Sequence, residues 1–163
     1  MILEDGEGYV SDERIKFVED QVGIKFPKFF IDMVQSEDGG YPIANYDEIL
    51  YFNQDLGRNI VTGIGVFLSI GSNKNENILE EYLNSSDFFP KNLVPFAVTG
   101  GGDYFCFDYR EGKHLTDPPI VYWFHEAEPK NSVSFLANNF EDFIGMFKPE
   151  GYYDHLLGGS SGE

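Results

Sequence analysis

The residues of this chain with the most potential for chemistry are three histidines, one cysteine and a large number of carboxylates. His114, His125 and His155 show none of the short spacings that bring metal ligands together on one helix face or turn. Cys106 lies between two phenylalanines, which favours a buried thiol, since a nucleophile would need a nearby base. We therefore expect no metal, no cofactor and no nucleophilic catalysis.

The most specific stretch of the sequence is a glycine-rich turn within residues 93–108. Two apolar runs flank Gly100-Gly101-Gly102, and Asp103 follows directly. Glycine reaches the positive φ angles that tight turns need, so the pattern predicts a β-hairpin. A phosphate-binding loop would end in Gly-Lys-Ser or Gly-Lys-Thr and open a helix, whereas this turn opens a strand. We expect Asp103 to pin the turn by accepting hydrogen bonds from backbone N–H groups.

The chain is strongly acidic, with 28 acidic residues, 11 basic residues and a formal net charge of −17. Nucleic acids and anionic membrane surfaces are disfavoured as ligands, because binding to either depends on lysine and arginine. A basic protein partner is favoured, because opposite charges speed encounter. The acidity is equally typical of a protein that only needs to stay soluble.

Many of the carboxylates occur as neighbours in the sequence. The pairs are Glu4-Asp5, Asp12-Glu13, Glu37-Asp38, Asp47-Glu48, Glu80-Glu81 and Glu141-Asp142. Two carboxylates can hydrolyse a glycoside when their surroundings push their pKa values apart. Neighbours on solvated faces lack such surroundings, so a carboxylate-dependent hydrolase is an alternative and not the leading hypothesis.

Aromatic residues close to acidic ones offer a second kind of site. Exposed tyrosine and tryptophan are typical anchors for a protein partner, although strand aromatics often belong to the core instead. The residues that we predict to contact a partner are Glu37, Asp38, Asp47, Glu48, Tyr122 and Trp123.

Length and composition predict one folded domain. The 163 residues are 42% hydrophobic and 17% aromatic, which is enough for a packed core without staples. A single cysteine permits no intrachain disulfide and suits a reducing compartment. The first residues lack the basic start and apolar run of a signal peptide, and no run approaches the roughly 20 apolar residues of a membrane span. We therefore expect a cytoplasmic protein.

The N-terminal part predicts two helices. Residues 1–10 form an acidic leader, and Ser11 or Asp12 caps a helix that Gly23 ends. Pro27 suits the first position of a second helix, which ends at the glycines of residues 39–40. Together these segments predict a helical hairpin.

The middle and C-terminal parts predict a sheet with further helices. We expect strands at 49–52, 64–70, 93–98, 104–109 and 120–124, a polar loop at 53–59, a short helix at 76–83 and a turn at 126–131. Both faces of 104–109 carry aromatics, which predicts a central strand. Asn138 or Asn139 caps a last helix whose apolar stripe is Phe140, Phe143, Ile144 and Phe147. The order of elements predicts an α+β domain with a mainly antiparallel sheet, an N-terminal helical hairpin and a C-terminal helix packed on the sheet.

Taken together, these segments resemble the SUKH superfamily, which includes bacterial immunity proteins and yeast regulators of cell-wall synthesis. The resemblance rests on the first helix, Gly23-Ile24-Lys25-Phe26-Pro27, Gly39-Gly40, the Leu-Val-Pro-Phe-Ala of residues 93–97, the Gly-Gly-Asp-Tyr-Phe-Cys-Phe-Asp of residues 101–108, the Pro-Ile-Val-Tyr of residues 119–122, and a closing helix from Ser134 to Phe147. It spans about residues 11–148, followed by a flexible tail at 149–163. The motif residues, expected to be mainly structural, are Pro27, Gly40, Pro95, Phe96, Gly101, Gly102, Asp103, Phe107 and Asp108.

The resemblance implies an α+β fold, no catalytic residues and, as in bacterial members, neutralisation of a toxin that is often a nuclease. Our leading hypothesis is therefore a non-catalytic acidic immunity protein whose partner is a cognate toxin or another basic protein. A regulatory scaffold that binds an endogenous partner, as the yeast members imply, is the main alternative. Nothing in the sequence indicates an oligomeric state.

Overall fold

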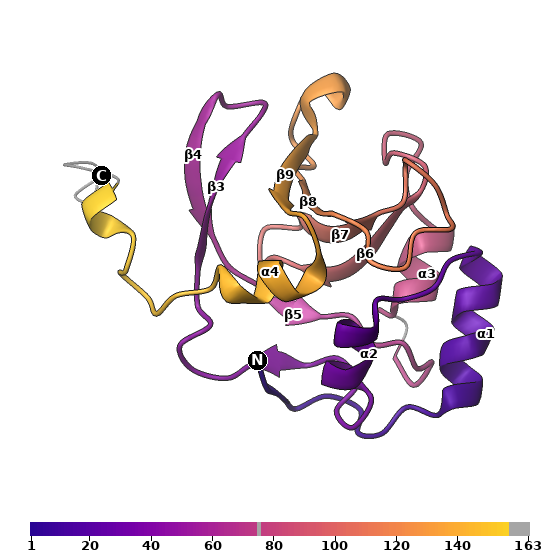
Figure 1. Cartoon of the computed structure of the whole chain (residues 1–163). Helices are drawn as coiled ribbons and strands as arrows, with labels where there is room; N and C mark the ends of the chain where they lie inside the picture. The colour runs from indigo at the N-terminus through magenta and orange to yellow at the C-terminus, as the bar shows by residue number, and fades with distance from the viewer. Residues whose placement is uncertain (75, 157–163) are drawn as a thin grey trace.

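A five-stranded antiparallel sheet, ordered β5-β6-β7-β8-β9, occupies the centre of the molecule (Figure 1). The structure is a computed structural model, and it describes residues 1–74 and 76–156. The strands of the central sheet are β5 (Val66–Phe67), β6 (Leu93–Val98), β7 (Tyr104–Asp108), β8 (Ile120–Trp123) and β9 (Val133–Ala137). Two smaller antiparallel pairs join β1 (Leu3–Glu4) to β2 (Tyr41–Pro42) and β3 (Ile49–Asn53) to β4 (Arg58–Thr62). The predicted α+β fold with a mainly antiparallel sheet is confirmed.

Strand β7 lies in the middle of the sheet and is covered on both faces, as its sequence predicted. Phe105 and Phe107 belong to the main core cluster, which also contains side chains from the helices. Cys106 points the other way, into a smaller cluster that it shares with Phe89 and Leu93. Successive residues of a strand face opposite sides, so a strand that is apolar on both faces must lie between two layers.

A bulge in β6 explains the proline within this strand. Proline cannot donate a hydrogen bond to a neighbouring strand, so sheets accommodate it at bulges or edges. The pairing of β6 with β7 shifts between Pro95 and Ala97, which leaves Phe96 without a partner residue on β7. Phe96 is fully buried, so the bulge directs one more aromatic ring into the core.

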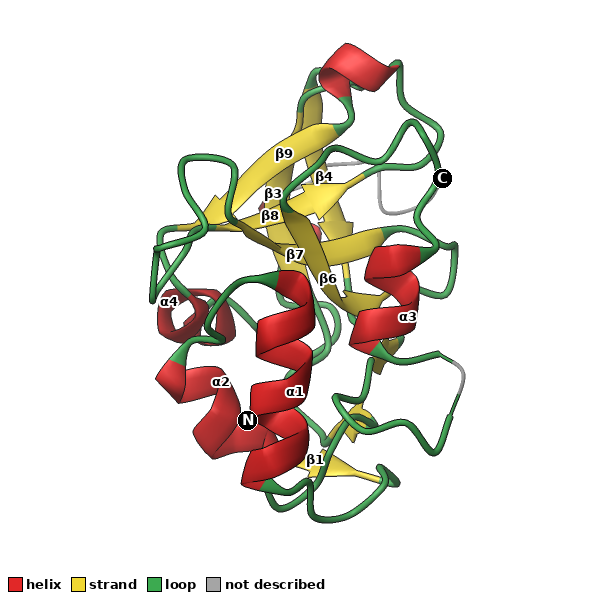
Figure 2. Ribbon diagram, turned by 90° about the vertical axis from the view of Figure 1, so that its right-hand side faces the viewer, coloured by secondary structure: helices red, strands yellow, loops and turns green. Residues whose placement is uncertain are grey.

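Four α-helices flank the sheet, and Figure 2 shows α1, α2 and α4 gathered below it. Their bounds are α1 Asp12–Val22, α2 Lys28–Val34, α3 Ile78–Leu83 and α4 Phe140–Gly145, and a 3-10 helix covers Pro129–Asn131. None of the helices in the described part of the chain is long and apolar enough to cross a membrane.

Side chains at the helix ends bear out most of the predicted boundaries. The Ser11 side chain accepts from Arg14 N, and Gly23 ends α1 in the left-handed conformation. Asn139, and not Asn138, caps α4, with its side chain accepting from Asp142 N. Pro27 lies one position outside α2 and not at its first helical residue.

The core is built from aromatic rings that join the sheet to α2 and α4. The Phe96 ring lies 6.0 Å from that of Phe30 on α2, 4.5 Å from Phe107, and 5.5 and 5.6 Å from Phe140 and Phe143 on α4, measured between centroids. Tilted and edge-to-face contacts dominate, which is the arrangement that aromatic rings prefer. The predicted docking of the C-terminal helix on the sheet is therefore made by ring packing.

Residues of the predicted leader, and residues 150–153 of the predicted tail, contact the folded domain. Leu3 and Val10, within the predicted leader, are buried, and β1 pairs with β2. In the predicted tail, Glu150 N donates to Asp47 Oδ2 at 3.1 Å and the Tyr153 hydroxyl donates to Met146 O at 2.9 Å. Residues 157–163 of that tail lie outside the described residues.

Four strands of the described residues, β1, β2, β4 and β9, were not predicted, and the predicted closing helix from Ser134 begins too early. The loop expected at 53–59 is shorter, since β4 already begins at Arg58 and pairs with β3. The strand expected at 64–70 is reduced to Val66–Phe67. Residues Val133–Ala137, expected to belong to the closing helix, form β9 and pair with β8. Each of these segments takes its structure from a partner strand, which local sequence does not encode.

We expect Phe96→Ala to lower the free energy of unfolding by about 3–5 kcal/mol, because it removes a ring that contacts three core elements. The matched change Phe52→Ala, on a side chain that is 48% exposed on β3, should cost less than about 1 kcal/mol. Urea unfolding followed by circular dichroism measures both. Equal losses would contradict the assignment of Phe96 to the centre of the core.

Candidate functional site

The glycine turn between β6 and β7 is held by Thr99 and Asp103. Gly102 N donates to Thr99 O at 3.2 Å, Thr99 N to Asp103 O at 2.9 Å, and Asp103 N to Thr99 Oγ1 at 3.1 Å. Gly102 has a φ of 95°, a left-handed conformation that side chains other than glycine rarely adopt. Gly101, by contrast, is exposed, and a side chain at its position would have room.

The carboxylate of Asp103 connects this turn to β8 and the loop after it. Its Oδ2 accepts from the Tyr122 hydroxyl at 2.6 Å, and its Oδ1 accepts from His125 N at 3.0 Å. The Nδ1 atom of His125 lies 2.5 Å from the same Oδ1. Asp103 and Tyr122 are buried, so these bonds form largely away from water. Within the turn only the backbone N and O of Asp103 form hydrogen bonds, so the predicted acceptance by its side chain from neighbouring backbone N–H groups is not what the structure shows. The carboxylate instead ties the turn to Tyr122 and His125.

The same cluster reaches the β3–β4 hairpin. The Tyr51 ring packs on that of Tyr122 with centroids 4.6 Å apart, and Asn53 Nδ2 donates to the Tyr51 hydroxyl at 2.9 Å. Burial, followed by the hydrogen bond to Asp103, raises the pKa of the Tyr122 phenol above its ordinary value of 10.0. Proton transfer by Tyr122 near neutral pH is therefore disfavoured, and the cluster acts as a structural link.

A second buried carboxylate, Asp38, joins the end of the N-terminal region to the segment after β5. Its Oδ1 accepts from Ile70 N and its Oδ2 from Gly71 N, both at 2.7 Å. Burial raises the pKa of Asp38, and these two backbone hydrogen bonds oppose the shift. Gly40 lies close by with a φ of 95°, and a Cβ there would overlap Glu4 O. Only glycine fits at this position.

Asp108, the third buried carboxylate, lies at the end of β7. Its Oδ1 accepts from the backbone N and Nε of Arg110 at 3.0 and 2.9 Å, and its Oδ2 accepts from Arg110 Nη2 at 2.9 Å. The three buried carboxylates thus lie in three separate clusters, each with its own donors. Asp38, Asp103 and Asp108 do not pair with one another, but Glu7 lies near Asp38. Its charge adds to the rise in the Asp38 pKa that burial causes, and both of its carboxylate oxygens are buried without a hydrogen-bond partner among the described residues.

The six residues predicted to contact a partner are not equally accessible. Asp38 and Tyr122 are 2% and 3% exposed and are used inside the fold, so we do not carry them forward as contact residues. Glu37 is half-buried and accepts from Gly8 N at 2.7 Å. Asp47 and Glu48 lie beside each other before β3, where they accept from backbone N–H groups of residues 150–151.

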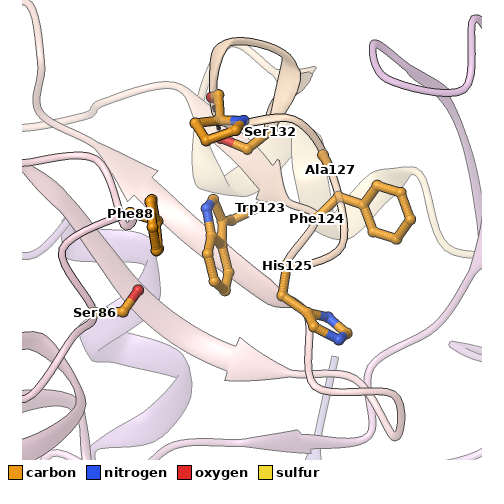
Figure 3. A pocket seen from close by; sticks show the side chains of 8 residues that line it. Ser86, Phe88, Trp123, Phe124, His125, Ala127 and Ser132 are labelled. Carbon is orange, nitrogen blue, oxygen red and sulfur yellow. Dashed lines mark hydrogen bonds between the residues drawn. The ribbon is translucent and has the colours of Figure 1, made fainter.

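Trp123 lies at the end of β8 beside a cavity of about 290 Å³ (Figure 3). Phe88, Phe124 and His125 line this cavity with it. A second cavity of about 290 Å³ adjoins the first, since Ser86, Trp123 and His125 line both. Phe88 is 73% exposed, an unusual position for so large an apolar side chain. Of the residues around this cavity, the sequence pointed only to Trp123.

We name this region, formed by Ser86, Phe88, Trp123, Phe124 and His125, the Trp123 pocket. Phe89, which also lies in the loop before β6, packs edge-on against Trp123 with centroids 5.0 Å apart and so helps to hold the indole in place. No signal in the sequence of residues 84–92 pairs that loop with β8. The pocket depends on the folded sheet and could be found only in the structure.

Neither a metal-binding cluster nor an accessible thiol lies among the described residues. Among residues 1–74 and 76–156 no three His, Cys, Asp or Glu side chains gather closely enough to hold a metal ion. Cys106 is fully buried, and burial raises the pKa of its thiol well above the ordinary value. A thiol held neutral in this way is a poor nucleophile.

Comparison with known proteins gives two matches. Residues 9–146 match the model of the SMI1 / KNR4 family (SUKH-1). The chain is also similar to the SPbeta prophage-derived uncharacterized protein YokK of Bacillus subtilis (strain 168), with 28% identity over 145 residues. That alignment covers 82% of this chain and 72% of the Bacillus protein.

Removal of the Asp103 carboxylate should destabilise the protein strongly. Asp103→Ala leaves the buried Tyr122 hydroxyl and the His125 N–H without their acceptor, so we expect a loss of about 2–4 kcal/mol in the free energy of unfolding. Asp117→Ala, which removes an exposed carboxylate, should change it by less than about 0.5 kcal/mol. Chemical denaturation at neutral pH compares the two variants, and a loss for Asp103→Ala no larger than that of the control would refute the structural role.

Buried phenols should make the protein sensitive to alkali. The pKa values of Tyr104, Tyr109 and Tyr122 are raised, with burial as the first cause in each case. Above pH ~10 the unfolded chain loses these protons while the folded chain keeps them, so stability is complete below that pH and falls as the pH rises. In this range each such phenol lowers the free energy of unfolding by about 1.4 kcal/mol for each pH unit.

The free energy of unfolding, measured in urea between about pH 8 and pH 11, should therefore fall less steeply for Tyr122→Phe than for the unmodified protein. Tyr9→Phe, at an exposed phenol, is the control and should leave the slope unchanged. Parallel slopes for all three proteins would contradict the burial of the Tyr122 hydroxyl as the cause.

Proposed function

Because this chain belongs to the SMI1/KNR4 family (SUKH-1), as its resemblance to the SUKH superfamily predicted, we propose that it is an immunity-type protein. In this proposal it binds a cognate cationic protein toxin and blocks it, and it catalyses no reaction itself. A nuclease is the class of toxin that the charge of this chain fits best. The protein acts where the toxin would otherwise reach its target, in the cytoplasm.

The observation that carries the proposal is the surplus of carboxylates at the surface. Of the acidic side chains in the described residues, only Asp38, Asp103 and Asp108 are buried. Ion pairs with lysine or arginine engage four acids, namely Glu19, Asp20, Asp32 and Asp108. With a net charge of −17, most carboxylates therefore face solvent without a neutralising neighbour.

A nuclease must present lysine and arginine to the phosphates of its substrate. An acidic protein that covers this surface replaces the substrate's charge and excludes it. Opposite fields also raise encounter rates by about 10–10³-fold, which suits a protein that must capture its toxin before damage occurs. Specificity for one toxin would then come from individual contacts, since charge alone attracts many cationic proteins.

The buried groups support a binding role over a hydrolytic one. Each buried carboxylate accepts hydrogen bonds within its own cluster: Asp38 from two backbone N–H groups, Asp103 from β8 and the loop after it, and Asp108 from Arg110. A general acid or base needs a free position beside the reacting atoms. Asp38, Asp103 and Asp108 are occupied by the fold in this way, whereas the buried oxygens of Glu7 have no hydrogen-bond partner among the described residues.

The regulatory scaffold is the competing function. The similarity to a prophage-derived protein of Bacillus subtilis favours a role in conflict between bacteria or their mobile elements over control of an endogenous pathway. The contact residues that we retain from the sequence are Glu37, Asp47, Glu48 and Trp123, which are at least partly accessible.

Co-expression tests the proposal most directly. The toxin module encoded beside this gene is expressed with and without the full chain, and growth is scored. Rescue of growth is expected with this chain and not with an unrelated acidic protein of similar net charge. Rescue by both proteins would show that net negative charge alone accounts for the rescue. Rescue by neither would refute immunity against that toxin.

Association with the toxin module should also depend on salt. Between about 0.05 M and about 0.5 M NaCl we expect the association rate constant to fall at least about tenfold, because the Debye length shrinks severalfold. The dissociation rate constant, set by short-range contacts, should change much less. Stopped-flow or surface-based kinetics measures both, and an association rate indifferent to salt would exclude electrostatic steering.

A further inference from the structure

We propose that the Trp123 pocket receives an arginine side chain from the cationic partner. The inference rests on the proposed function for the nature of the partner. The site itself is argued from its shape, its rings and the charges around it.

The walls of the pocket are aromatic. Phe88 and Trp123 both line the cavity, and Figure 3 shows their rings facing each other across it, with His125 on the far side of the indole. Tyr104 stacks against Trp123 with centroids 5.8 Å apart, and Phe89 supports it from its edge at 5.0 Å. The indole is therefore held in place by neighbours of its own fold before any partner arrives. The face of an aromatic ring attracts a cation, and that of tryptophan attracts it most strongly.

Acidic residues alternate with the residues that line the pocket, and we place their side chains at its rim. Asp87 lies between Ser86 and Phe88, and Glu126 and Glu128 alternate with residues that line the cavity. Glu81 lines the adjoining cavity, where it accepts from the Tyr104 hydroxyl at 2.6 Å. The segments that form the pocket, 84–90 and 123–132, contain three carboxylates and one lysine, Lys130. An apolar cavity with such a rim complements a side chain that is flat and apolar along its faces and positive at its end.

One polar atom in the pocket lacks a partner. The Nε1 atom of Trp123 is buried, and no hydrogen-bond acceptor for it lies among the described residues. Figure 3 shows this nitrogen at the end of the ring toward Ser132, which also lines the cavity. A buried donor without an acceptor is unfavourable, but because this atom is enclosed by the fold it adds no direct contact with an incoming segment.

Arginine fits these features better than lysine does. Its planar guanidinium stacks on an aromatic face and presents five donors to surrounding carboxylates, whereas the lysine ammonium is compact and strongly hydrated. An apolar side chain would fill the cavity and leave the acidic rim without a counter-charge.

The experiment uses the full-length protein and short peptides as probes. Trp123 is the only tryptophan of the chain, so its fluorescence reports on this pocket alone. The probes are acetyl-Gly-Arg-Gly-amide and its lysine, citrulline and norleucine counterparts, each titrated at about 0.15 M NaCl to screen long-range attraction. We expect a saturable fluorescence change, with the arginine peptide binding at least about threefold more tightly than the lysine peptide and more tightly still than the two neutral ones.

Two variants locate the effect. Phe88→Ala, at a side chain that is 73% exposed and so not needed for folding, should weaken binding of the arginine peptide about fivefold. Glu128→Gln should weaken it by about twofold. The controls are Phe135→Ala and Glu141→Gln, at exposed positions on β9 and α4, and these should leave binding unchanged.

Several results would overturn the proposal. Equal affinity for the arginine and lysine peptides, with no effect of Phe88→Ala, would indicate attraction by the overall charge only. Equal affinity for the citrulline or norleucine peptide would indicate an apolar groove that does not select a cation.

The proposal and the immunity function can fail separately. If growth is rescued by the unmodified chain and equally by Phe88→Ala and Trp123→Ala, immunity stands and the pocket is not its arginine site. If the peptide binds as expected and growth is not rescued, the pocket recognises arginine and the assignment of this toxin is wrong.

Discussion

Ring packing between the central sheet and the helices α2 and α4 is the constraint on which the other features depend. Phe96 and Phe107, stacked 4.5 Å apart, contact Phe30 of α2 and Phe140 of α4. These contacts bring the N-terminal helices, the hairpin of β6 and β7 and the C-terminal helix together around one apolar centre. The bulge at Pro95 is part of the same arrangement, because it turns an additional ring inward. This aromatic packing holds the central sheet together, and the sheet positions the end of β8, where Trp123 and His125 lie.

Carboxylates have two different uses in this molecule. A few are taken out of water and act as acceptors that tie distant segments together, as Asp38 does for Ile70 and Gly71 and Asp103 does for His125. Most of the rest are at least partly exposed to solvent and are available to a partner. A substitution can therefore be sorted by burial: changes in the first group affect folding, and changes in the second affect recognition.

How much could be predicted from sequence follows from how local each signal is. The first helix was predictable because Ser11, the apolar spacing and Gly23 are all neighbours in the chain, and the glycine hairpin with its central strand was predictable for the same reason. Strand β9 was not, since Val133–Ala137 becomes a strand by pairing with β8. The list of contact residues mixed accessible and buried positions, because Asp38 and Tyr122 look like surface residues in the sequence and are enclosed only by tertiary structure. The Trp123 pocket required the loop of residues 84–92 to lie beside β8, a relation with no local signature.

The position of the one cysteine has a further consequence. Cys106 lies in the central strand with no exposed surface, and burial disfavours its thiolate. A thiol-reactive reagent can modify it only after the structure around β7 has opened, so the rate of alkylation reports how often this part of the sheet opens under native conditions. The same enclosure prevents two folded copies from cross-linking through sulfur.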